Sequence, residues 1–123
     1  MTPATPGPGP GSAILVAALL TVALAGLAFV SRMLGTGMLG PNPLVGFRLP
    51  ALLDSEAAWR RGHQAAVRPL TVAASVGFLA LVGSVLASQH VLPYLIFLGI
   101  AMAVMIIGVI VSAVVAVRAA KKA

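Results

Sequence analysis

The chain has 123 residues, of which 60% are hydrophobic and only 8% are charged. A soluble domain carries about 25% charged residues, so a chain this short and this apolar must use a lipid bilayer as part of its solvent. The net charge is +6, but the basic residues flank apolar runs and do not form a basic helix with interleaved aromatics, which argues against a nucleic-acid partner. The absence of cysteine excludes disulfides, thiolate metal sites and cysteine nucleophiles.

Residues 1–12 form a Pro/Gly tract that we expect to be extended and disordered, outside the membrane. A secretory signal peptide is the competing interpretation, but this tract lacks the Lys or Arg that begins one. The apolar run that follows predicts a first transmembrane helix over residues 13–34, with Ser12 as its candidate N-cap. Small residues recur at every fourth position of this run and would let another helix pack closely: Ala13, Ala17, Thr21 and Ala25.

The central loop, residues 35–68, contains both acidic residues of the chain, Asp54 and Glu56, and the only tryptophan, Trp59. An active site is one interpretation of this cluster. Helix capping, helix-dipole interactions and membrane topology account for the same charges, and His63 has no second His or Cys nearby that would complete a metal site. We therefore expect no enzymatic activity, no metal and no cofactor.

The end of this loop predicts a short helix over about residues 55–67. Asp54 or Ser55 would cap it, and the acidic residues would favour its N-terminal dipole. Its modest apolar face and cationic end are typical of a helix that lies on the membrane surface. Trp59 would anchor that helix at the interface.

Two further apolar runs predict a helical hairpin. The second transmembrane helix is expected over residues 69–87, with a proline in its first turn, and the third over residues 92–117. The turn between them, residues 88–91, is so short that the two helices must be antiparallel neighbours. His90 in this turn is interpreted as a solvated residue, with pH sensing or ligand binding as the alternative. A basic tail, residues 118–123, follows.

With three spans, all eight Lys and Arg residues fall on the same side of the membrane. Cytoplasmic loops carry an excess of basic residues, so we expect the central loop and the C-terminus in the cytoplasm and the N-terminus outside. The fold class predicted is thus an all-α integral membrane protein with three transmembrane helices and a cytoplasmic interfacial helix. No Asp, Glu, Lys, Arg or His lies within the apolar runs 13–30, 69–87 and 92–117, which argues against an autonomous transporter or channel.

An ordered set of residues in the central loop carries a resemblance to a known family: Asn42, Gly46, Phe47, Arg48, Pro50, Ser55, Glu56 and Trp59. Their order between membrane spans resembles the signature of the SdpI family of small bacterial membrane proteins, over roughly residue 31 to the end. Two positions depart from the pattern. Leu49 stands where the family often has Thr, and His63 stands where it often has Asn.

The resemblance implies a protein of the bacterial cell membrane that binds a protein or peptide partner as well as lipids. It also implies a role in immunity against a toxic peptide or in signalling, with the signature residues forming a docking element. The alternative that remains open is a structural accessory subunit of a larger bacterial membrane complex, such as a respiratory supercomplex. The small-residue stripes and the lack of polar groups within the spans suit that alternative.

Overall fold

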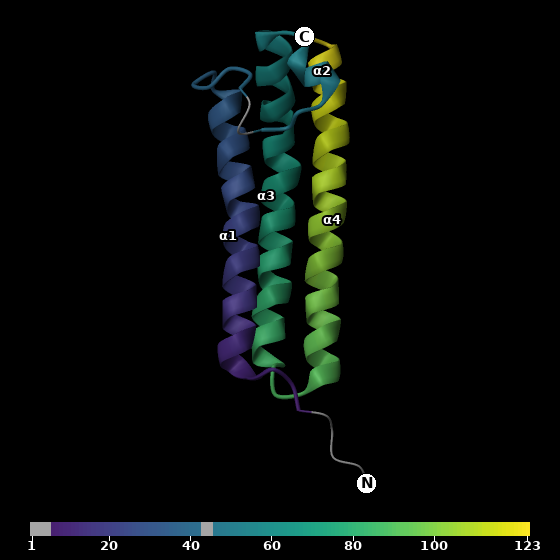
Figure 1. Cartoon of the computed structure of the whole chain (residues 1–123). Helices are drawn as coiled ribbons and strands as arrows, with labels where there is room; N and C mark the ends of the chain where they lie inside the picture. Colours follow the sequence, from purple (N-terminus) through teal and green to yellow (C-terminus); the bar gives the residue numbers. More distant parts are fainter. Residues whose placement is uncertain (1–5, 43–45) are drawn as a thin grey trace.

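The computed structural model describes residues 6–42 and 46–123 of the chain. The helices are, in chain order, α1 (Gly9–Gly35), α2 (Pro50–Leu53), α3 (Glu56–Leu86) and α4 (Val91–Lys121). The three long helices run side by side with α3 between α1 and α4, and α2 lies with the C-terminus at the end of the bundle opposite the start of α1 (Figure 1). All three are long and apolar enough to cross a membrane. The predicted class, an all-α membrane protein with three spans, is confirmed.

The helix α1 begins earlier than the sequence indicates. Its first residue is Gly9, so the end of the tract that we expected to be disordered forms the first turn, and Ser12 is not the N-cap. A proline in that first turn loses no helical hydrogen bond, because the first N–H groups of a helix have no partner within it. The N–H groups of Gly7 and Gly9 donate to the carbonyls of Gln89 and Ser88, which ties the chain to the turn between α3 and α4.

The helix α3 is continuous from Glu56 to Leu86, where we expected a surface helix followed by a separate membrane helix. Pro69 lies in its interior and not in a first turn. The helix continues through this residue because the turns on both sides are packed, with Ala66 and Leu70 fully buried. Its 31 residues span about 46 Å, longer than the ~30 Å hydrocarbon core. The segment over residues 55–67 is therefore an extension of a membrane helix.

Small residues bring α3 and α4 close together. A Cβ at Gly108 of α4 would overlap the Cβ of Ala73 on α3, and a Cβ at Gly83 would lie 2.5 Å from the Phe97 ring. The buried Ser112 hydroxyl donates to the Gly108 carbonyl at 2.6 Å, so it leaves no unpaired group in the contact. Close packing of this kind drives helix association in lipid, because the hydrophobic effect does not act between helices there.

The predicted stripe of small residues on α1 faces a neighbour only in part. Ala13 is buried and Ala17 packs against the cluster formed by α3 and α4, but Ala25 is exposed. At the other end of α1, the Gln64 side chain donates to the carbonyl of Gly35 at 2.5 Å. This bond fixes the end of α1 to α3 beside the segment that carries the signature residues.

Candidate functional site

The loop and α2 between α1 and α3 form a cap on one end of the bundle, which we define as residues 36–42 and 46–55 (Figure 1). The hydrophobic cluster beneath it combines all four helices, with Leu34 from α1, Leu52 from α2, Trp59 from α3 and Ala116 from α4. Leu52 is fully buried against Gly62, where a Cβ would lie 2.6 Å from the Leu52 Cγ atom. The cap is thus packed into the bundle.

Trp59 lies in the interior and does not anchor the chain at the membrane interface as we expected. Its side chain is only 1% exposed, and its Nε1 donates to the carbonyl of Leu39 in the cap at 3.2 Å. Its ring lies 4.4 Å from that of His63, one turn further along α3. This face of α3 meets α1 and the cap, so the indole is enclosed by protein.

His63 connects the cap to α3 through both ring nitrogens. The backbone N–H of Phe47 donates to Nε2 at 2.9 Å, so Nε2 carries no proton. The proton therefore resides on Nδ1, which lies 2.7 Å from the carbonyl of Trp59. His63 is fully buried. Within residues 6–42 and 46–123, no group of three or more His, Cys, Asp or Glu side chains could hold a metal ion.

Gly46 occupies a position that no other residue fits. Its φ is +104°, a left-handed conformation that disfavours any side chain. A Cβ there would lie 2.8 Å from His63 Nε2, 2.8 Å from Leu34 Cδ1 and 2.9 Å from Trp59 Cη2. The glycine of the signature is therefore required because the cap backbone passes directly over the His63 and Trp59 rings.

Asn42 and Arg48 are brought together at the surface of the cap. The Arg48 guanidinium donates to the backbone carbonyl of Asn42, and the Asn42 side-chain amide donates to the carbonyl of Gly40 at 2.9 Å. Both side chains thus hold loop backbone in place. This arrangement explains why an asparagine and an arginine occur at these positions without any bound substrate.

The remaining signature residues begin helices or lie beside the loop. Pro50 is the first residue of α2, and the Ser55 hydroxyl accepts the N–H of Ala58 at 3.0 Å as the N-cap of α3. The prediction that Asp54 or Ser55 caps a helix is confirmed for Ser55. Glu56 lies in the first turn of α3, near Gly40, where its charge favours the helix dipole.

A family model supports the resemblance noted from the sequence. The model of the SdpI/YfhL protein family matches residues 38–117, which is more than half of the chain. The chain belongs to the SdpI/YfhL family. The matched region contains every predicted signature residue, α2, α3 and most of α4, whereas α1 lies outside it. Neither the search of curated proteins nor the search of solved structures found a match.

Four residues form long-range hydrogen bonds at the cap end of this SdpI/YfhL protein that were not predicted from the sequence, although Phe47 and His63 were singled out there for other reasons. Leu39 and Phe47 contribute through backbone groups, and Gln64 and His63 through side chains. Each of these bonds joins residues 16 to 29 positions apart in the chain. The sequence signal that could have identified them is the presence of two polar side chains, His63 and Gln64, just before an apolar run long enough to span a membrane.

Proposed function

We propose that this SdpI/YfhL-family protein is a non-enzymatic membrane protein that docks a protein or peptide on its cap, in immunity or signalling. The observation that carries the proposal is that the signature residues, together with His63, shape the cap. Trp59, His63 and Gly46 fix the path of the cap backbone, and Asn42 and Arg48 hold its surface loop. Because the signature residues determine the shape of one surface, we infer that this surface is the one that binds a partner.

The exposed part of the cap offers a surface of the composition that protein contacts favour. Met38 is 71% exposed and Leu53 is 40% exposed, although both lie on the short elements that cover the bundle end. A groove of about 430 Å³ runs between α2 and the end of α4, with Asp54 and Lys121 among its lining residues. Apolar side chains rimmed by charges of both signs are typical of a docking surface.

The state of His63 supports a non-enzymatic role. His is the side chain most often used for proton transfer in catalysis, and it must reach the substrate to act. Here the ring is buried and both nitrogens are engaged by backbone groups. His63 therefore serves to position the cap.

The orientation that we propose places the cap in the cytoplasm and the N-terminus outside the bacterial cell membrane. All eight basic residues lie in the cap, in the final turns of α1 and α4 or just after them, or in the first 13 residues of α3, including Arg32, Arg68 and Arg118. The turn between α3 and α4, at the opposite end of the bundle, contains no Lys or Arg. The excess of basic residues in cytoplasmic segments supports this assignment.

The proposal is tested by the phenotype of a deletion strain challenged with membrane-active peptide toxins. Loss of the protein should increase sensitivity, and wild-type protein should restore resistance. Leu53→Asp, at an exposed cap position, should fail to restore it, whereas Gln89→Asp adds the same charge at the opposite end and should succeed. A deletion strain that behaves like the parent under every challenge would sink the immunity role.

A second candidate, an accessory subunit of a larger membrane complex, is favoured by a groove between α1 and α3. Six of its eight lining residues are small or carry hydroxyls, and its volume is about 480 Å³: Thr21, Ala25, Ala28, Thr71, Ala74, Ser75, Phe78 and Leu79. Small residues and hydroxyls are enriched where membrane helices meet. Native mass spectrometry separates the two candidate functions. If the protein is an accessory subunit, the wild type should carry a stoichiometric membrane partner, which the Ala25→Phe variant should lose and the Leu53→Asp variant should keep.

A further inference from the structure

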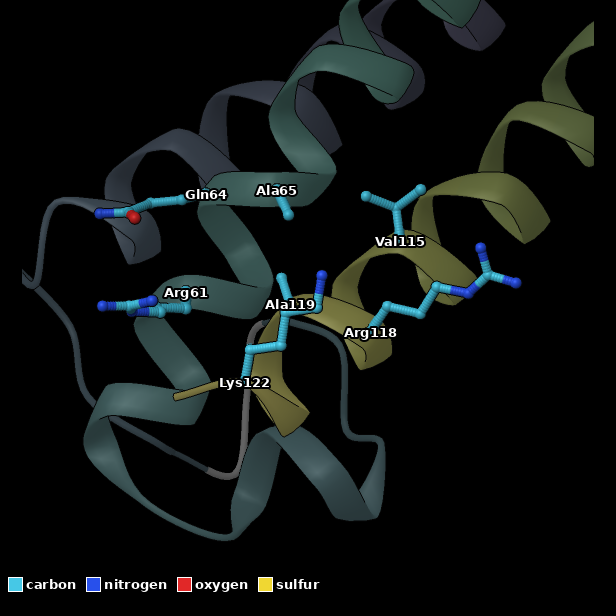
Figure 2. A pocket seen from close by; sticks show the side chains of 7 residues that line it. All are labelled: Arg61, Gln64, Ala65, Val115, Arg118, Ala119 and Lys122. Carbon is cyan, nitrogen blue, oxygen red and sulfur yellow. The ribbon is translucent and has the colours of Figure 1, made fainter.

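A basic groove opens between α3 and α4 at the end of the bundle that carries the cap. Its volume is about 620 Å³, and its lining residues are Arg61, Gln64, Ala65, Val115, Arg118, Ala119 and Lys122. Three of these seven are cationic and none is acidic. The Arg61 and Arg118 side chains point away from each other on the two sides of the groove, and Lys122 lies between them (Figure 2). Gln64 is already engaged by the Gly35 carbonyl, so the three cations dominate the chemistry of this groove.

A second groove lies between the same two helices and is apolar throughout. Its volume is about 360 Å³, and its lining residues are Pro69, Val72, Ala73, Val76, Val104, Ile107, Gly108 and Val111. Val72 and Ile107 are more than half exposed, so this face is turned away from the helical core. Gly108 and Ala73 form its floor because they allow the two helices to approach closely.

The two grooves lie on one seam. On α3 the lining positions Ala65, Pro69, Val72 and Val76 recur every three or four residues, which places them on one helix face. On α4 the positions from Val115 to Val104 recur in the same way. One helical turn, about 5 to 6 Å, separates the basic groove from the apolar groove. Together the two grooves form a trough that is cationic at one end and apolar along the rest of its length.

We propose that this trough binds one anionic phospholipid, with its phosphate attracted to Lys122 and to the flanking Arg61 and Arg118, and with an acyl chain lying along the apolar groove. Basic pockets between membrane helices at the cytoplasmic side bind anionic headgroups. The trough runs about 16 Å from Val115 to Val104, close to the depth of one leaflet of a ~30 Å hydrocarbon core. A free anion would contact only the basic groove, whereas a phospholipid has a phosphate that suits the basic groove and an acyl chain that suits the apolar groove.

The test is native mass spectrometry of the full chain released from nanodiscs that contain equal amounts of phosphatidylglycerol and phosphatidylethanolamine. The wild-type protein should retain phosphatidylglycerol in preference to phosphatidylethanolamine. Arg118→Gln with Lys122→Gln should lower that retention roughly tenfold, since each basic residue near an anionic lipid contributes a separate attraction. The matched control, Arg60→Gln with Lys121→Gln, removes two charges from the same end outside the groove and should retain the lipid.

The apolar part is tested separately by Val72→Phe with Ile107→Phe, which fills the groove from two exposed positions and leaves the core intact. This variant should lose phosphatidylglycerol, whereas Leu95→Phe with Ile106→Phe, also exposed, should keep it. Equal retention of the two lipids by wild type, or equal loss in both charge variants, overturns the proposal. If glycerol phosphate at equal concentration displaces the lipid, the ligand is a soluble anion and the proposal is overturned. If a photoreactive amino acid at Val115 cross-links to a protein, the trough holds a protein partner and the proposal is likewise overturned.

Discussion

At the scale of single residues, the molecule depends on one contact between the cap and α3. The cap backbone reaches α3 at Gly46 and Phe47, and the rings of Trp59 and His63 lie directly below. Two hydrogen bonds secure this contact: the Trp59 ring donates to the carbonyl of Leu39, and the His63 ring accepts the N–H of Phe47. Because Trp59 is the only tryptophan of the chain, its fluorescence reports on this contact alone.

Gly46→Ala should destabilise the folded protein by about 2 kcal/mol or more, because it combines a left-handed backbone with overlap against His63, Leu34 and Trp59. The unfolding midpoint in detergent titrations followed by Trp59 fluorescence should fall. The control is Gly26→Ala, where a Cβ meets no atom within 4 Å and the helix interior favours alanine. Equal midpoints for the two variants would refute the packing account of Gly46.

His63→Ala should cost about 1–3 kcal/mol, because the N–H of Phe47 would lose its acceptor in a partly buried place. His63→Gln should recover part of this loss, since an amide oxygen can accept the same N–H. The check is the same fluorescence-monitored unfolding of the two variants. A Gln variant no more stable than the Ala variant would show that the hydrogen bond does not contribute.

The residues that sequence reasoning found and those that it missed differ in one physical respect. Gly46 and Trp59 stood out as members of the ordered set between membrane spans, whereas the contact of the cap with His63 joins residues 16 positions apart in the chain. Trp59 was assigned to the membrane interface because its amphipathic ring prefers that region. Only the path of the cap over α3 shows that the ring is enclosed.

At the scale of whole elements, the three long helices were predictable because a lipid-spanning helix carries its apolar signal within itself. The start of α3 was not, because a proline suits the first turn of a helix and Pro69 therefore indicated a boundary. Ser55 caps the helix well before it, and packing on both sides carries the helix through the proline. The start of α1 at Gly9 was missed for a related reason, since a Pro/Gly tract favours no helix by itself.

The close contact of α3 with α4 gives a prediction at this scale. Gly108→Ala places a Cβ against that of Ala73 and should destabilise the hairpin by about 1–3 kcal/mol through overpacking. Gly99→Ala is the matched control on the same helix, because a Cβ there meets nothing within 4 Å. Unfolding midpoints of the purified variants provide the measurement. A Gly108 variant as stable as the Gly99 variant would mean that the helices can separate at little cost.

At the scale of the whole molecule, the distribution of charge supports the proposed orientation. The chain contains no cysteine, so single cysteines can be introduced without a background of native thiols. Gln89→Cys, in the exposed turn, should react with a membrane-impermeant maleimide on intact cells, and Met38→Cys, in the cap, should react only after permeabilisation. The opposite pattern of labelling would invert the proposed topology and place the cap outside the cell.

The central claim is that the cap is a docking surface, and site-specific photo-crosslinking in living cells tests it most directly. A photoreactive amino acid at Leu53 on the cap is compared with one at Leu86, which is also exposed but lies at the opposite end of the bundle. We predict a discrete protein or peptide adduct from Leu53 and none of that mass from Leu86. Failure of Leu53 to give any adduct beyond those formed at Leu86 would contradict the claim.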